Sequence, residues 1–117
     1  SLHDALPILC HGMTMRQARE SDRSVLVASK NVSTIAAMPR PKIVGQTEGL
    51  IRVLVDADDH TVLGATLWCI DSQELVNLVG LAMRLGARDE TLRDGIWTHP
   101  SSTEAFNEVL GALAPLD

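Results

Sequence analysis

Two apolar segments separated by a short acidic stretch are the feature that most constrains how this 117-residue chain can fold. In residues 49–56, apolar side chains recur at every second position, so one face of an extended segment is wholly aliphatic. That face consists of Ile51, Val53 and Val55. Residues 56–60 are polar turn material, and residues 61–69 are apolar again. The pattern predicts a β-hairpin in an antiparallel sheet that buries one face, with a bulge or a close backbone approach at Gly64.

The segment that follows the hairpin, residues 71–86, has the apolar spacing of a helix. Asp71 is predicted to cap its N-terminus, with Glu74 completing a capping box, and Gly86 is predicted to end it in the left-handed conformation. The main apolar stripe consists of Leu75, Leu78, Val79, Ala82 and Leu85. Further apolar residues widen this stripe, so the helix has to be covered on more than one side, in a core or in a subunit interface. Gly80 leaves room for close packing.

Weaker signals place the remaining elements. Thr14 and Gln17 fit a capping box at the start of a short helix that runs to about residue 20. The other expected elements are a strand at 24–30, an irregular connection at 31–40, a short strand at 42–46, a short helix capped by Asp89 and ending at Gly95, and a last helix from about Ser101 to Pro115. Together they predict a single α+β domain in residues 9–117, an antiparallel β-sheet flanked by helices.

Composition and charge argue against several classes of function. The net charge of −5 argues against a nucleic-acid binder, which needs a basic surface. No apolar run reaches the roughly 18–20 residues that a membrane span requires. Cys10 and Cys69 are far apart and have no metal or redox spacing, so a reduced, cytoplasmic location is expected. Cys69 is predicted to be a small buried residue rather than a reactive thiol.

Residues 1–8 are expected to be non-native. They have no initiating methionine, no basic region and no long apolar core, so they do not match a signal peptide. They look like the translated end of a sequencing adapter. On this interpretation the natural protein extends upstream, and the chain is a fragment of a larger one.

The clearest candidate for chemistry is His99, which directly precedes Pro100, with Glu104 five positions further on. A His–Pro bond favours extended backbone at the histidine and permits a cis peptide. A carboxylate beside the second imidazole nitrogen is the arrangement of a positioned general acid–base. The alternative is structural, because with Ser101 as N-cap Glu104 stands at the third helical position, where it would be a capping-box carboxylate. Both roles are compatible, since a carboxylate has two oxygens.

Residues 92–107, Leu-Arg-Asp-Gly-Ile-Trp-Thr-His-Pro-Ser-Ser-Thr-Glu-Ala-Phe-Asn, resemble the C-terminal signature of the pyridine nucleotide-disulfide oxidoreductases. These flavoprotein disulfide reductases include glutathione reductase, dihydrolipoamide dehydrogenase and mercuric reductase. The predicted hairpin also resembles the family's, and residues 11–14 resemble the segment that opens its interface domain. The His99 block is most similar to a branch that responds to reactive chlorine and hypothiocyanous acid.

The resemblance implies the fold of the FAD/NAD-linked reductase dimerisation domain, whose helices pair two subunits into a homodimer. It implies that His99 is the acid–base for the redox thiols of the partner subunit and that Glu104 orients it. The His99–Pro100 peptide is implied to be cis, with the two residues next to the partner subunit's flavin. FAD and NAD(P)H would be held by N-terminal domains that this chain lacks, so the fragment alone is expected to bind neither and to be inactive.

Other functions fit the sequence less well. A free-standing α+β dimerisation module without chemistry is the main alternative. An independent hydrolase using Ser101 or Ser102 with His99 lacks a Gly-x-Ser-x-Gly nucleophile elbow. The histidines have no metal-ligand spacing, and the acidic turn at residues 56–59 lacks the glycine and distal glutamate of a calcium loop.

Overall fold

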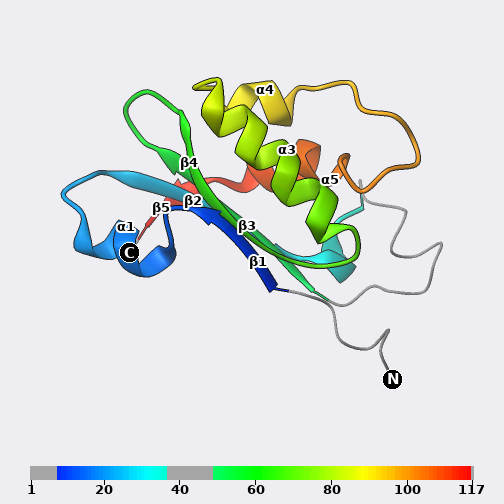
Figure 1. The fold of residues 1–117 in the computed structure, drawn as a ribbon, viewed down its shortest axis with the longest axis horizontal. Coiled ribbons are helices and arrows are strands. Elements are labelled where there is room, and N and C mark those ends of the chain that lie inside the picture. The colour runs from blue at the N-terminus through cyan, green and yellow to red at the C-terminus, as the bar shows by residue number, and fades with distance from the viewer. Residues whose placement is uncertain (1–7, 37–48, 117) are drawn as a thin grey trace.

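A five-stranded sheet forms the centre of the protein in a computed structural model that describes residues 8–36 and 49–116 (Figure 1). Its strands are β1 (Ile8–Gly12), β2 (Val25–Asn31), β3 (Leu50–Asp56), β4 (Val62–Trp68) and β5 (Ala114–Pro115). They lie in the order β1-β4-β3-β2-β5, and every pair is antiparallel. The helices are α1 (Met15–Glu20), α3 (Ser72–Arg84), α4 (Asp89–Arg93) and α5 (Ala105–Val109), with 3₁₀ turns at Val32–Thr34 and Leu110–Ala112. The predicted α+β class is confirmed.

The predicted hairpin is formed by β3 and β4, and Gly64 lies at an irregularity in it. Leu54 is paired with Gly64 but the next residue, Val55, is paired with Val62, so one residue of β4 is unpaired. Such a bulge shifts the alternation of side chains, and Val62 and Ala65 therefore reach the same core. A Cβ atom at Gly64 would collide with the Met13 backbone. The predicted bulge and the predicted close approach both occur.

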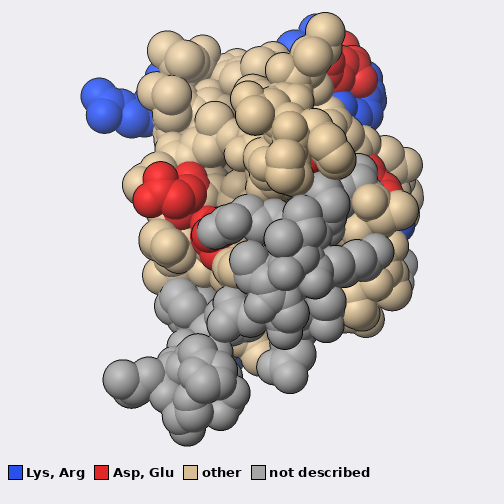
Figure 2. Space-filling view, turned by 90° about the vertical axis from the view of Figure 1, so that its right-hand side faces the viewer, with Lys and Arg blue, Asp and Glu red and all other residues tan. Residues whose placement is uncertain are grey.

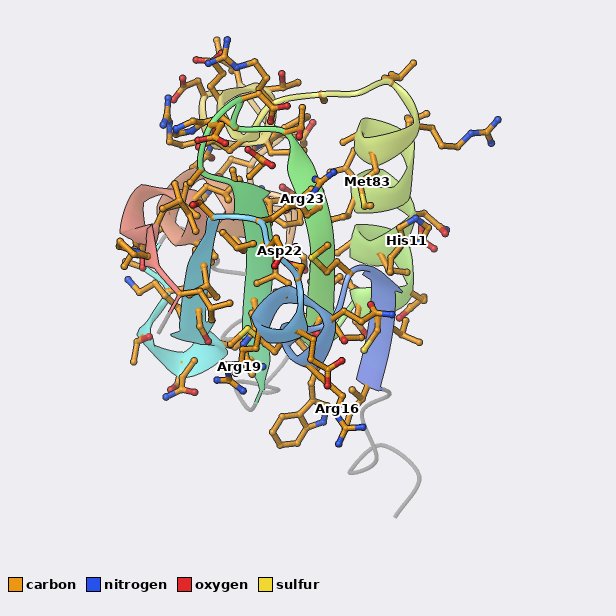
Figure 3. The ribbon with its side chains drawn as sticks, turned by 90° about the vertical axis from the view of Figure 1, so that its left-hand side faces the viewer. His11, Arg16, Arg19, Asp22, Arg23 and Met83 are labelled. Atoms are coloured by element: carbon orange, nitrogen blue, oxygen red, sulfur yellow. The ribbon has the colours of Figure 1, made fainter. Side chains whose placement is uncertain are left out.

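Both faces of the sheet are covered, but unequally. Helices α3, α4 and α5 lie on one side and α1 on the other (Figures 1 and 3). The larger core includes Ile51, Val53 and Val55 of β3 together with Leu75, Val79, Phe106 and Val109 of the helices. Leu54, which points the opposite way, packs instead with Ala18 of α1 and Val25 of β2. Each fully buried aliphatic or aromatic side chain in these cores contributes roughly 1.5–3 kcal/mol.

Local signals placed α1 and the end of α3 correctly. The Thr14 hydroxyl accepts the Gln17 N–H at 3.1 Å, and the Gln17 side chain accepts the Thr14 N–H at 2.9 Å, which completes the predicted capping box. Gly86 has a φ of 66°, so it ends α3 in the left-handed region. The predicted close packing at Gly80 is made with the ring of His11, which reaches from β1 toward α3 (Figure 3).

Predictions that depended on distant partners were partly wrong. Leu85 was expected in the buried stripe of α3 but is 75% exposed, because it follows the last helical residue, where the chain turns at Gly86. The last helix begins at Ala105 instead of Ser101, and the chain then forms a 3₁₀ turn and β5, where a continuous helix to Pro115 was expected. Strand β1 was not predicted at all, since as an exposed edge strand it carries no alternating apolar pattern.

Two further expectations concern the connections. Asp89 was expected to cap α4 but is its first helical residue, and α4 ends at Arg93 rather than Gly95. The Asp89 carboxylate is buried and accepts hydrogen bonds from Glu90 N–H and from His60. The strand predicted at residues 42–46 lies outside the described residues. The described part of the chain contains no helix that is long and apolar enough to cross a membrane.

The difference in burial between Leu75 and Leu85 can be tested through the stability of the domain. Leu75 is 2% exposed and Leu85 is 75% exposed, although both were predicted to lie on the same apolar stripe. We expect Leu75→Ala to lower the free energy of unfolding by about 2–5 kcal/mol, because it leaves a cavity under the helix. Leu85→Ala, the matched control, should change it by no more than about 0.5 kcal/mol. Equal effects in chemical denaturation would contradict this packing.

The two cysteines are both free, and they should differ in their reactivity toward alkylation. Cys69 is buried, as predicted, and burial followed by the nearby Asp71 carboxylate raises the pKa of its thiol to about 12. Because the thiolate is the reactive form, Cys69 should resist alkylation by iodoacetamide at about pH 8 until the chain is unfolded, while exposed Cys10 reacts. Mass spectrometry should therefore count one adduct in the native protein and none in Cys10→Ser. Rapid double modification of the native protein would contradict it.

Candidate functional site

The candidate site lies in the loop of residues 94–104, which joins α4 to α5 and projects away from the helices in Figure 1. Its first half is held by side chains that bind backbone carbonyls. The indole N–H of Trp97 donates to the carbonyl of Leu92 at 3.1 Å. The side-chain amide of Asn107 donates to the carbonyls of Arg93 and Gly95 at 2.8 and 3.0 Å. Sequence analysis gave no role to Trp97 or Asn107, because such backbone contacts have no sequence pattern.

The structure brings His99 and Glu104 together. The peptide between His99 and Pro100 is cis, as the resemblance implied. His99 Nδ1 lies 2.9 Å from Glu104 Oε1, and the other oxygen, Oε2, accepts the backbone N–H of Ser101 at 2.8 Å. The carboxylate therefore serves the imidazole and the backbone at once, which is the compatible arrangement anticipated above. Ser101 is not the N-cap, since Glu104 itself occupies that position before α5.

The chemistry of this pair follows from its exposure. The side chain of Glu104 is 15% exposed, whereas that of His99 is 70% exposed. An ionised carboxylate only accepts hydrogen bonds, so Nδ1 carries the proton in this contact. The opposite ring nitrogen, Nε2, is then the atom of His99 that can take up or release a proton. The pair is thus an oriented acid–base group on an exposed loop.

The pKa of Glu104 agrees with its role as an anion. Partial desolvation alone would raise it, but the hydrogen bonds from His99 and from Ser101 N–H, with the charge of His99, outweigh that effect. The net result is a pKa below the ordinary value of 4.5. Glu104 is therefore ionised at any pH near neutrality, so its orienting contact with the imidazole persists there.

A second contact fixes the other end of the loop. The Ser102 hydroxyl donates to Asp71 Oδ2 at 2.6 Å, and Ser102 is 6% exposed. Asp71 precedes α3 in a left-handed conformation, with φ 62° and ψ 17°, and its side chain makes no capping hydrogen bond. Asp71 thus occupies the predicted N-cap position of α3, but the predicted side-chain cap and capping box with Glu74 are wrong. The carboxylate instead accepts the hydroxyl of Ser102 in the His99 loop.

Other chemistries find little support in the described residues. Within residues 8–36 and 49–116, no three His, Cys, Asp or Glu side chains are grouped so as to hold a metal ion. The Ser102 hydroxyl donates to Asp71 and Nδ1 of His99 faces Glu104, so these side chains do not form a serine–histidine pair through those atoms. Pro100, also predicted to lie next to a flavin, is exposed beside His99.

His60 and Asp89 form a similar pair, which sequence analysis missed. His60 Nδ1 lies 3.2 Å from Asp89 Oδ1, and the aspartate side chain is only 2% exposed. This pair joins the β3–β4 turn to the start of α4, and Arg93 approaches the same carboxylate at 3.8 Å. Its position between two packed elements indicates a structural contact. A histidine–carboxylate contact is therefore not sufficient to define a site, and exposure separates the two pairs.

Acidification should weaken the Glu104 contacts. Because the pKa of Glu104 is lower in the folded than in the unfolded chain, the unfolded chain binds this proton more readily. The stabilisation is thus complete above the unfolded value near 4.5 and is lost as pH falls through the lower folded value. We expect the melting temperature of the wild type to fall more steeply than that of Glu104→Gln between about pH 5 and about pH 2. Glu20→Gln, an exposed control, should show the same dependence of melting temperature on pH as the wild type. If Glu104→Gln also showed the wild-type dependence, the stabilising role of the Glu104 carboxylate would be contradicted.

Comparison with known proteins identifies the domain. A family model described as the pyridine nucleotide-disulphide oxidoreductase dimerisation domain matches residues 3–110. The probable pyridine nucleotide-disulfide oxidoreductase RclA of Escherichia coli is 40% identical over 107 residues, which are 92% of this chain and 24% of that protein. Dihydrolipoyl dehydrogenase 2 of Haloarcula marismortui is 32% identical over 118 residues, covering 94% of this chain and 24% of that protein.

A solved structure agrees with these relatives. The Cu(II) complex of the HOCl-induced flavoprotein disulfide reductase RclA from Escherichia coli matches with a TM-score of 0.85 and 38% identity, over 91% of this chain and 23% of that chain. The similarity to the reactive-chlorine branch is thereby confirmed. The chain spans about a quarter of the length of the relatives that it matches. It belongs to the dimerisation-domain family of the pyridine nucleotide-disulphide oxidoreductases.

Proposed function

We propose that this chain is the C-terminal homodimerisation domain of an FAD-dependent NAD(P)H disulfide oxidoreductase and that its His99–Glu104 pair acts in the active site of the partner subunit. The observation that carries the proposal is the geometry of the pair. Glu104 holds Nδ1 of His99 and the Ser101 N–H at once, while the imidazole is 70% exposed. An oriented but exposed acid–base group acts on something that the same domain does not contain.

We infer that the reacting thiols lie outside this chain. Cys69 is buried with a pKa of about 12, and Cys10 lies on β1, where its sulfur is 3.7 Å from the Thr66 hydroxyl. On this proposal, the redox thiols on which His99 acts belong to another part of the enzyme. The short span of this chain, about a quarter of its relatives, supports separate FAD and NAD(P)H domains upstream. Free cysteines agree with a cytoplasmic location.

The exposed surface around His99 is where we place the flavin of the partner subunit. His99 and Pro100 are exposed, and Ile96, close to them in the loop, is fully exposed at 101%. The described surface on this side is mostly uncharged, with basic side chains toward its upper margins and acidic side chains at the upper right and on the left (Figure 2). His99 and Pro100 would lie next to the flavin. When bound, the flavin supplies the path by which the electron pair of NAD(P)H reaches the disulfide.

The role of the chain's own residues is proton transfer. His99 Nε2 takes the proton of a thiol, which leaves the thiolate that attacks a disulfide sulfur. The same nitrogen then returns the proton to the departing sulfur, which leaves as a thiol rather than as a thiolate. Glu104 keeps the ring in one orientation and stabilises the imidazolium between the two steps.

The proposal is tested by replacing His99 in the full-length product of the natural gene. We expect His99→Gln to lower kcat for disulfide reduction by about 100- to 10,000-fold, with flavin content unchanged, because the step loses its general acid–base. Glu104→Gln should have a smaller effect. His60→Asn is the matched control, since it alters the second histidine–carboxylate pair and asparagine tolerates the φ of 64° at that position. Full activity of His99→Gln would contradict the acid–base role and leave this domain with dimerisation alone.

Mixed dimers separate action on the partner from action within one subunit. A His99→Gln subunit would be co-expressed with a subunit whose redox cysteine is replaced, and the hybrid purified by two different tags. If His99 acts across the interface, the hybrid has one complete active site and recovers turnover although both parent homodimers are inactive. If His99 acts within its own subunit, the hybrid is as inactive as the parents, and the cross-subunit assignment fails.

A further inference from the structure

Asp71 stands at the start of α3 in an arrangement that capping does not explain. It has a left-handed φ of 62°, and its side chain makes no capping hydrogen bond. Aspartate tolerates this conformation less readily than glycine does. Its Oδ2 accepts the Ser102 hydroxyl at 2.6 Å, a short contact typical of a hydroxyl bound to a carboxylate. The side chain thus connects α3 to the loop that carries His99.

We propose that Asp71 is a positioning residue for His99, fixing the His99 loop to α3 through Ser102. The proposal rests on the acid–base role of His99 proposed above. Ser102 lies between Ser101, whose N–H donates to Glu104, and Glu104 itself. A displacement of Ser102 therefore moves both the backbone donor and the carboxylate that orient the imidazole.

Ser102 is well placed to transmit this constraint. It is 6% exposed, and its carbonyl accepts the N–H of Ala105, the first residue of α5. In such a water-poor position a hydrogen bond to a carboxylate is stronger than at the surface. The side chain of Ser102 is thus fixed by Asp71 at the start of α3, and its carbonyl by Ala105 of α5.

The base of this connection is rigid. Leu75 and Val79 of α3 are 2% and 0% exposed and belong to the main core under the sheet. The first half of the loop is held separately, by Trp97 on Leu92 and by Asn107 on Arg93 and Gly95. His99 therefore lies between a half that is fixed to α4 and α5 and a half that Asp71 fixes to α3. Both halves have to be in place for one imidazole orientation.

Two substitutions separate the carboxylate from the backbone conformation. Asp71→Gly suits the positive φ but removes the acceptor, while Asp71→Asn tolerates that φ and keeps an oxygen that can accept the Ser102 hydroxyl. Ser102→Ala removes the donor. All three would be made in the full-length flavoenzyme and compared by hydrogen–deuterium exchange of peptides covering residues 99–104, with β3 peptides as the internal reference.

We expect Asp71→Gly and Ser102→Ala to speed exchange in residues 99–104 by about tenfold, while β3 stays unchanged. We expect the same two variants to lower kcat for disulfide reduction by about tenfold with little change in KM, because the imidazole spends less time in its productive orientation. Asp71→Asn should keep both the exchange rate of residues 99–104 and kcat close to those of the wild type. A purely structural role would instead lower the melting temperature and leave kcat unchanged.

The outcomes distinguish this inference from the proposed function. If Asp71→Gly leaves exchange in residues 99–104 unchanged, the connection is not made and the inference is overturned, whatever His99→Gln does. If exchange rises and His99→Gln abolishes turnover but Asp71→Gly does not lower kcat, the positioning role is overturned. If His99→Gln itself retains turnover, the proposed function fails, and a positioning role for catalysis falls with it.

Discussion

The pairing of β3 with β4 is the interaction on which the rest of the structure depends. It places Ile51, Val53 and Val55 on one side of the sheet and Leu54 on the other, which creates two apolar surfaces that helices have to cover. Covering the larger surface places α3 and α5 on the same core. The His99 loop is held between these two helices, so the geometry of the site follows from how the hairpin buries its aliphatic face.

The site combines a local and a distant constraint. Glu104 contacts His99, five positions before it, and Ser101, three positions before it. The histidine–carboxylate pair therefore forms within a single turn of chain. The contact between Asp71 and Ser102 spans 31 residues and exists only once α3 has packed on the sheet. A short motif can therefore form the pair, but packing of the domain decides where the pair is presented.

Exposure gives two similar histidine–carboxylate contacts different roles. Asp89 is almost fully buried and His60 is 37% exposed, so that pair joins the hairpin turn to α4 and has little room for a substrate. His99 is 70% exposed while Glu104 is largely covered, so the acid is fixed and the imidazole is accessible. That difference is why we propose proton transfer at His99 and assign a structural contact to His60.

The sequence by itself determined what depends on near neighbours. The alternation of residues 49–56, the Thr14 capping box, the bulge at Gly64 and the contact of His99 with Glu104 all arise from short-range stereochemistry and hydrophobic periodicity. Tertiary structure decided the rest. β1 and β5 form only because neighbouring strands offer free hydrogen-bonding edges, and Leu85 is exposed because α3 ends before it. The local sequence predicts that the Asp71 side chain caps α3. In the structure this carboxylate instead binds the Ser102 hydroxyl, which only the packed domain brings within reach.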